Sequence, residues 1–169
     1  MENAGYLRVL AFWSGAPGSV IHHRLRAECD SKSDVFDAQI RDLCLGLYER
    51  ACRHELAGWR VHPLLLLALI IVRDQFPRNM FRDSLRAFES DGIALDGARR
   101  MTAMHWNERL NAHERQFAYL PFEHAEQLEA QKASMPYFDR LADACGSQDL
   151  LEWSRKHYVI GERFGRFPH

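Results

Sequence analysis

Side chains that bind charged ligands or transfer protons gather in three short stretches of this chain. The first, residues 74–79, follows the most apolar run of the sequence, and the others are residues 123–126 and 163–169. Carboxylates and histidines commonly transfer protons in proteins, and arginines bind anions through charge-assisted hydrogen bonds. The candidate binding residues are Asp74, Gln75, Arg78, Asn79, Glu123, His124, Glu126, Arg163, Arg166 and His169.

Asp74 is the candidate under the strongest structural constraint. It lies seven residues after Leu67 and four after Ile70, so on a helix it continues a stripe that should be buried. A buried carboxylate needs a partner, because burial of an unpaired charge is costly. Arg73, Arg78 or an arginine from elsewhere in the chain would serve. The pair would be either a structural salt bridge at the end of a helix or part of a binding or catalytic site.

The second stretch places Glu123 and Glu126 three residues apart, as neighbours on an ideal helix, with His124 and Gln127 beside them. Together they would line one wall of a cleft, where they would transfer protons. A solvated or salt-bridged helix face is the alternative. Carboxylates and histidines also ligate metals, but the Glu-x-x-His motif that di-iron bundles repeat on two helices is absent here. We therefore expect no metal at this stretch.

The four cysteines and the pair His22–His23 do not indicate a metal site either. The chain has no Cys-x-x-Cys pair, so zinc-ribbon and thioredoxin-type motifs are absent. Cys44 and Cys52 are expected to be buried free thiols, because cysteine is among the most buried residue types. The two histidines are expected to be solvated on a loop. The sequence implies no cofactor.

The third stretch, residues 163–169, combines aromatic residues, a proline and two arginines, as the end of the apolar run does. Arg163 and Arg166 are candidates to neutralise Asp74, Glu123 or Glu126. Such a pairing would bring all three stretches to one place in the fold.

The elements that would position these residues are helices, and the central one is predicted at residues 63–76. Its apolar part, Leu64–Val72, is dominated by leucine and alanine, which favour a helix. It is too short to cross a membrane, which takes about 20 residues, and a helix that is apolar on every side belongs in a core. Pro63 suits the first turn. Pro77 disfavours the helical conformation at Phe76 and is expected to end the helix there.

Further helices are predicted on both sides of the central one. Residues 4–13 show helical spacing of apolar side chains, and residues 14–19 are typical of a loop. An apolar stripe predicts a helix that begins at a cap, Ser33 or Asp34, and ends near Leu56, before Gly58. The remaining helices are predicted at residues 85–105 after a cap at Asp83 or Ser84, at 113–146 with interruptions or bends at Pro121 and Pro136, and at 148–164 with Gly165 as its C-cap.

The composition is that of one globular domain spanning residues 1–169. The formal net charge is −1 and the pI is about 6.8, so no nucleic-acid partner is expected. The N-terminus lacks the basic and apolar regions of a signal peptide, and we expect a soluble, cytoplasmic protein without a membrane partner. No alternating strand pattern is present, and the helix lengths and short connections predict an all-α domain of antiparallel helix pairs.

Three motifs, in order along the chain, resemble those of the bacterial DUF924 family. Residues 74–82, Asp-Gln-Phe-Pro-Arg-Asn-Met-Phe-Arg, resemble the signature D-Q-F-P-R-N-x-F-R. Residues 114–126 resemble the block E-R-x-F-x-Y-L-P-x-E-H-S-E, and residues 163–169 match the block R-F-G-R-F-P-H. Weaker N-terminal elements of the family are similar to residues 9–13 and 36–40, so the resemblance covers nearly the whole chain.

The resemblance implies an all-α, TPR-like array of antiparallel helix pairs around the buried central helix. It implies no established function. Two departures stand out. The family's W-x-x-D approach to its F-D-x-x-I helix is degraded at residues 29–34, and the helical tail that the family usually has after the final histidine is missing beyond His169.

Two functions from different classes fit these observations. The first, which the sequence favours, is a protein or peptide interaction module, since stacked helix pairs offer concave surfaces; its polar motifs would hold helix ends together. The alternative is a small-molecule-binding protein or enzyme in which Asp74, Glu123 and His124 line a pocket and the arginines bind a small anionic ligand. A cavity at Glu123, His124 and Arg166 would favour this alternative. Either protein would be a monomer or a homodimer.

Overall fold

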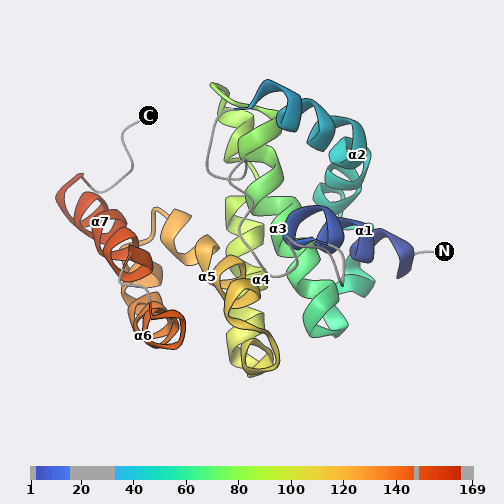
Figure 1. The fold of residues 1–169 in the computed structure, drawn as a ribbon. Helices are drawn as coiled ribbons and strands as arrows, with labels where there is room; N and C mark the ends of the chain where they lie inside the picture. The colour runs from blue at the N-terminus through green and yellow to red at the C-terminus, as the bar shows by residue number, and fades with distance from the viewer. Residues whose placement is uncertain (1–2, 16–32, 147–148, 165–169) are drawn as a thin grey trace.

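The computed structural model describes residues 3–15, 33–146 and 149–164. Every regular element in these ranges is helical, which confirms the predicted all-α class (Figure 1). The α-helices are α1 (Asn3–Ser14), α2 (Asp34–Cys52), α3 (Pro63–Met80), α4 (Asp91–Ala103), α5 (Ala112–His124), α6 (Leu128–Cys145) and α7 (Asp149–Phe164), and the short 3-10 helices are η2 (Ala57–Val61), η3 (Leu85–Ala87) and η4 (Trp106–Arg109).

Helix α3 is the centre of the fold, as predicted. Every side chain from Leu66 to Val72 is at most 2% exposed, and α1, α2, α4 and α5 all pack against this helix (Figure 1). Gly97 lets α4 come close, because a Cβ atom at this position would lie 3.0 Å from Cγ1 of Ile70. Among the described residues, no helix has both the length and the apolar character needed to span a membrane.

The prediction that α3 ends at residue 76 is wrong, because the helix continues through Pro77 for a further turn. Proline has no N–H group, so the carbonyl of Arg73, four residues earlier, loses its donor within the helix. The buried hydroxyl of Ser90 donates to this carbonyl at 2.5 Å. A bond from outside the helix thus replaces the missing one, and the additional turn carries Arg78 into position.

Two other predicted boundaries differ from the structure. Helix α2 begins at its predicted cap, Ser33, but it ends at Cys52 rather than near residue 56. His54 has a left-handed backbone conformation, with φ of 61°, which a right-handed helix cannot include. The helix predicted at residues 85–105 begins only at residue 91, and Ser84 caps the 3-10 turn η3 that precedes it.

Helices α5 and α6 run through Pro121 and Pro136, so neither proline interrupts its helix, and the bends given as the alternative stay a prediction. The break between the two helices falls at residues 125–127 instead. The start of α5 is fixed by a capping box, in which Asn111 and Glu114 each accept a hydrogen bond from the other's backbone N–H at 3.0 Å. The last turn of α5 carries Glu123 and His124 of the second polar stretch.

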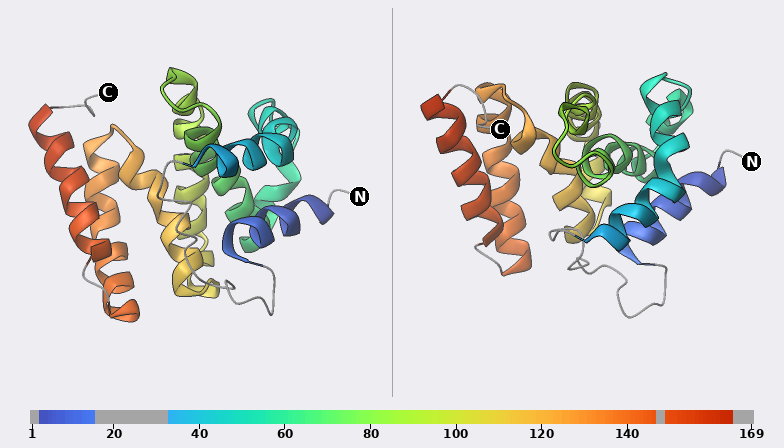
Figure 2. Two further views of the ribbon diagram at one scale, coloured as in Figure 1. Left: turned by 45° about the horizontal axis from the view of Figure 1, so that its top comes forward. Right: turned by 90° about the horizontal axis from the view of Figure 1, so that it is seen from above.

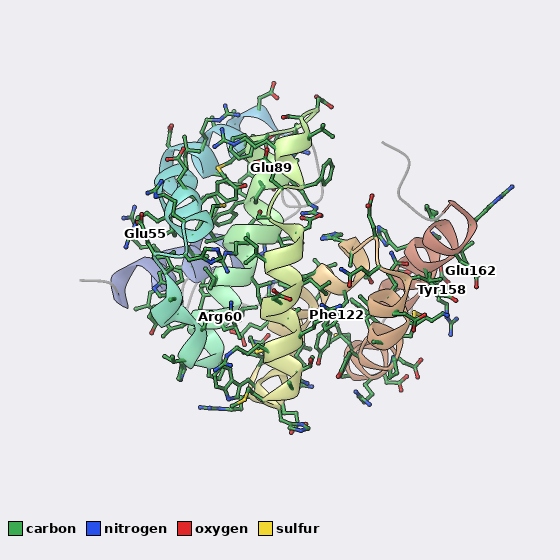
Figure 3. The ribbon with its side chains drawn as sticks, turned by 180° about the vertical axis from the view of Figure 1, so that it is seen from behind. Glu55, Arg60, Glu89, Phe122, Tyr158 and Glu162 are labelled. Carbon is green, nitrogen blue, oxygen red and sulfur yellow. The ribbon has the colours of Figure 1, made fainter. Side chains whose placement is uncertain are left out.

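Helices α6 and α7 form a pair beside α5, and both views of Figure 2 show the two side by side. A second apolar cluster connects this pair to the rest of the molecule, with Phe122 between α4 and α6 (Figure 3). The members of the cluster are Leu95, Ala98, Phe122, Ala125 and Ala130. The single-domain organisation and the TPR-like arrangement stay predictions.

The helices predicted near both ends of the chain are confirmed as α1 and α7. Cys44 is a buried free thiol, as expected, whereas Cys52 is free but only partly buried. Several predictions fall outside the described residues: most of the loop at 14–19, the pair His22–His23, the degraded approach at 29–32 and the cap at Gly165.

We expect the substitution Ser90→Ala to lower the free energy of unfolding by about 1–3 kcal/mol, because it leaves the buried carbonyl of Arg73 without a donor. In a Pro77→Ala background the helix regains its own N–H group, so Ser90→Ala should cost markedly less. Urea unfolding of the four proteins measures this coupling. An equal cost in both backgrounds would contradict the role assigned to Ser90.

Candidate functional site

Asp74 lies on α3 with its side chain fully buried. His124, the last residue of α5, places Nδ1 2.8 Å and 3.0 Å from the two carboxylate oxygens. The side-chain amide of Gln75 donates to Oδ2 at 2.6 Å, and Nη1 of Arg78 lies 3.4 Å from Oδ1. The partner that the sequence required for Asp74 is therefore Arg78 together with a histidine from the second polar stretch.

The Asp74 carboxyl is held in its ionised form by these neighbours. Burial by itself raises its pKa, but the charges of His124 and Arg78 and the hydrogen bonds from His124 and Gln75 bring the pKa below its usual value. An ionised carboxylate only accepts hydrogen bonds, so Nδ1 of His124 carries a proton and donates it. The other ring nitrogen, Nε2, is then the atom at which a neutral His124 accepts a proton.

Arg78 connects Asp74 to the first turn of α4. Its two Nη atoms donate to the two carboxylate oxygens of Asp91, each at 2.9 Å, in the forked geometry of a bidentate ion pair. Burial disfavours the Arg78 cation, but Asp74 and Asp91 outweigh this effect and raise its pKa. Burial raises the pKa of Asp91 even though Arg78 opposes the rise. The guanidinium of Arg78 is thus already neutralised within the protein.

A cavity of about 740 Å³ lies beside this network. The side chain of His124 is 17% exposed, so its ring is accessible from the cavity that it lines. Leu85, Phe88 and Leu95 make up an apolar part of the wall. The polar part of the wall is formed by Arg78, Asp91, His124, Glu126, Gln127 and His157. Residues from the first two polar stretches therefore meet at one cavity.

Glu123 is buried at the end of α5, where α7 approaches it. Nδ1 of His157 lies 3.6 Å from Oε2 of Glu123, and the rings of His124 and His157 have centroids 6.3 Å apart. Oε1 of Glu123 has no hydrogen-bond partner among the described residues. Burial raises the pKa of Glu123 to about 8; a hydrogen bond with Ser154 opposes the rise and the charge of Asp74 adds to it. Buried carboxyl groups with raised pKa values concentrate at functional sites.

The prediction that Glu123 and Glu126 are neighbours on one helix face is wrong, because α5 ends at His124. Glu126 is exposed in the connection between α5 and α6, where it lines the cavity. Gln127, expected beside them, is the N-cap residue of α6 and accepts a hydrogen bond from Arg99 at 2.8 Å. One wall of the cavity is therefore a helix end and a connection rather than a continuous helix.

Asn79 is a candidate that does not line the cavity. Its side-chain amide donates to Asp37 of α2 at 3.0 Å, and Arg82 forms an ion pair with the same carboxylate. Arg73, considered as a partner for Asp74, instead donates to the carbonyl of Ala51 near the end of α2. These polar residues of α3 and of the turn that follows it hold α3 to α2, which is the structural role that the sequence left open for the motif.

Helix α7 contributes to the site through His157, which the sequence gave no reason to choose. No spacing connects His157 with Glu123, and only the packing of α7 beside α5 brings them together. The sequence did not single out Asp91 either, because its partner Arg78 lies on another helix. Its place as an acidic residue in the first turn of a helix was the one available signal. Arg163 is exposed in the last turn of α7. Arg166 and His169 lie outside the described residues, so the pairing predicted for the C-terminal arginines stays a prediction.

The acidic and histidine side chains of the site do not converge as metal ligands do. Among the described residues, no three histidine, cysteine, aspartate or glutamate side chains are arranged to hold a metal ion. Each of the two histidines instead directs Nδ1 towards a carboxylate, Asp74 or Glu123. This arrangement is suited to proton transfer.

The comparisons with known proteins agree with the three motifs. The model of DUF924, a bacterial protein family of unknown function, matches residues 9–169. The chain belongs to the DUF924 family. The solved structure of a protein of unknown function from Agrobacterium tumefaciens is 30% identical in sequence and superposes with a TM-score of 0.88, covering 100% of this chain and 89% of that chain. Among curated proteins, none matches this chain.

We expect Asp74→Ala to lower the free energy of unfolding by about 3–5 kcal/mol, because it removes the buried partner of His124 and one of the two carboxylates that neutralise Arg78. Asp96→Ala is the matched control, since the side chain of Asp96 is 62% exposed and lies 3.8 Å from Arg99; this variant should lose less than about 1 kcal/mol. Chemical denaturation compares the two variants. Equal losses would mean that the Asp74 network contributes no more than a surface ion pair.

The raised pKa of Glu123 predicts a pH dependence of stability. Between its ordinary value of 4.5 and about 8, the folded protein keeps a proton that the unfolded chain releases. The contribution of Glu123 to the free energy of unfolding therefore falls as pH rises through this window and is constant above it. A positive charge on His157 would stabilise the ionised form of Glu123 and so reduce this pH dependence of stability.

Glu123→Gln removes this titration, so the variant should gain stability relative to the unsubstituted protein as pH rises from about 5 to about 8, by at most about 5 kcal/mol. Urea unfolding at several pH values measures the difference. Glu126→Gln, at an exposed position nearby, is the control and should follow the unsubstituted protein. A difference between Glu123→Gln and the unsubstituted protein that does not change with pH would show that the Glu123 pKa is not raised.

Proposed function

We propose that this chain binds a small polar molecule in the cavity between α3, α4, α5 and α7, and that His124 exchanges a proton with the bound molecule. One observation carries the proposal: the fully buried carboxylate of Asp74 holds Nδ1 of an imidazole that lines the cavity. A carboxylate in this position fixes the tautomer and the orientation of a histidine that acts as a general base. His124 would be the proton acceptor, and Asp74 the residue that positions it.

The cost of burying Asp74 supports a functional role for this pair. Replacing a buried ion pair by apolar side chains is often neutral or stabilising, and the part of α3 that precedes this polar segment, residues 63–72, is entirely apolar. Glu123 and His157 supply a second carboxyl–imidazole pair next to the first. The carboxyl of Glu123 has a raised pKa and that of Asp74 a lowered one. Glu123 would therefore be a proton donor beside the acceptor His124, and acid–base chemistry requires one of each at a site.

The lining of the cavity indicates the class of ligand. Arg78 is paired with two carboxylates, Asp74 and Asp91, so it has little positive charge to offer, while Glu126 adds negative charge. Leu85 and Phe88 provide an apolar wall. A ligand with a neutral or cationic polar group and an apolar portion fits this lining better than the anionic ligand expected from the sequence.

The protein or peptide interaction module, favoured by the sequence, stays a prediction. Exposed large apolar side chains come from separate elements, for example Leu7 of α1, Val61 of η2 and Val159 of α7. Leu85 and Phe88, which are also exposed, belong to the wall of the cavity. The polar motif residues at the cavity therefore support the small-molecule proposal more directly than they support a docking surface for a protein.

The proposal is tested by ligand-observed NMR with a library of small amines, amides, alcohols and carboxylates. We expect fragments that compete for one site, and their affinity should fall by at least about tenfold in His124→Gln, which corresponds to about 1.4 kcal/mol. His62→Gln is the control, because His62 is exposed at the start of α3 and makes no capping hydrogen bond. Fragments that bind His124→Gln as well as they bind the unsubstituted protein would contradict the proposal.

A further inference from the structure

A second cavity, of about 520 Å³, lies on a different part of the molecule and shares no lining residue with the first. It is formed by the end of α4, the turn η4, the first half of α5 and the second half of α6. Its principal polar residues are Asn107, Arg115, Tyr119, Tyr137 and Arg140. None of the three sequence motifs pointed to it as a site, although the second motif begins with residues that line it.

Arg115 lines this cavity and, among the described residues, pairs with no carboxylate. Nε donates to the carbonyls of Asn107 at 2.9 Å and Leu110 at 3.0 Å, and Nη2 donates to the carbonyl of Glu108 at 3.2 Å. These acceptors are neutral peptide groups, so they fix the direction of the guanidinium without supplying a negative charge. His105, which immediately precedes η4, has a left-handed backbone conformation with φ of 55°. The turn η4 that follows it directs these backbone carbonyls towards Arg115.

Arg140 supplies a second positive charge from α6. Its guanidinium lies over the ring of Tyr137, 5.2 Å from the centroid, and among the described residues it forms no ion pair with a carboxylate. A guanidinium stacked on an aromatic ring keeps its edge available for hydrogen bonds to a planar or tetrahedral anion. The two arginines therefore give the cavity a positive character.

Tyr119 brings a hydrogen-bond donor to the same cavity. Its hydroxyl is buried and accepts a hydrogen bond from Nδ2 of Asn107 at 3.1 Å, so the hydroxyl proton is left to donate. Burial raises the pKa of Tyr119, and the positive charges of Arg115 and Arg140 both oppose that rise. Arg115, Arg140 and Tyr119 all line this one cavity.

The acidic residue of the lining does not cancel this charge. The side chain of Glu108 is 69% exposed and pairs with Nδ1 of His105 at 3.2 Å. Its carboxylate is therefore screened by water and already engaged. The balance inside the cavity is positive, in contrast to the cavity at His124.

We propose that this second cavity is a binding site for a small oxyanion, a carboxylate or a phosphate group, held by Arg115, Arg140 and the hydroxyl of Tyr119. The proposal is independent of the function proposed for the His124 cavity. It places the anionic ligand expected from the sequence in a part of the molecule where, as far as the structure describes the chain, the arginines form no ion pair with a carboxylate.

The test is a titration of the isotope-labelled protein with inorganic phosphate and, separately, with benzoate, at constant ionic strength. We expect saturable chemical-shift changes in residues 102–108, 115–119 and 137–141 with at least one of the two ions, and the tighter ion identifies the class. Arg140→Gln should weaken the binding by at least about tenfold, because it removes a charge-assisted hydrogen bond. Arg140 is exposed, so the variant is expected to fold.

The controls separate a specific site from general attraction of anions. Arg53→Gln removes the same charge at an exposed position at the end of α2, outside the lining of the cavity, and should leave both affinities unchanged. Tyr119→Phe, which keeps the ring and removes the hydroxyl, should weaken binding as well. The proposal is overturned if neither ion gives saturable shifts in these residues, or if Arg53→Gln weakens binding as much as Arg140→Gln does.

Discussion

The burial of a charged carboxylate directly after the chain's most apolar run is the constraint on which the rest of the structure depends. Helix α3 is surrounded by other helices, so Asp74 has no water to solvate its charge. The compensation comes from an imidazole at the end of α5 and from a guanidinium that is itself paired with the start of α4. Three helices are thereby fixed relative to one another at the edge of a single cavity.

The proline within α3 is part of the same arrangement. Because the helix continues past Pro77, Arg78 lies one turn beyond Asp74 and contacts both Asp74 and Asp91. Ser90, which satisfies the carbonyl left open by the proline, immediately precedes Asp91 in the chain. One short segment therefore stabilises the extended helix and also delivers the carboxylate that completes the network.

The signature of the family serves two purposes because its residues lie on two faces of one helix. Asp74 and Arg78 are four residues apart and share the face towards α4 and α5, where the cavity lies. Asn79, in the last turn of α3, and Arg82, just after the helix ends, both bind Asp37 of α2. A motif that looks uniform in sequence is thus divided between a candidate site and a helix–helix contact, and periodicity alone does not say which face meets which neighbour.

The sequence by itself determined the all-α class, the central position of α3 and the need for a partner at Asp74, because residue types and local spacing decide these features. It also identified His124 as a candidate, through its motif. Only the tertiary structure decided that His124 is that partner and that Asp91 and His157 belong to the site, since these contacts join residues far apart in the chain. It also decided that α3 passes Pro77, because the hydrogen bond that permits this comes from outside the helix.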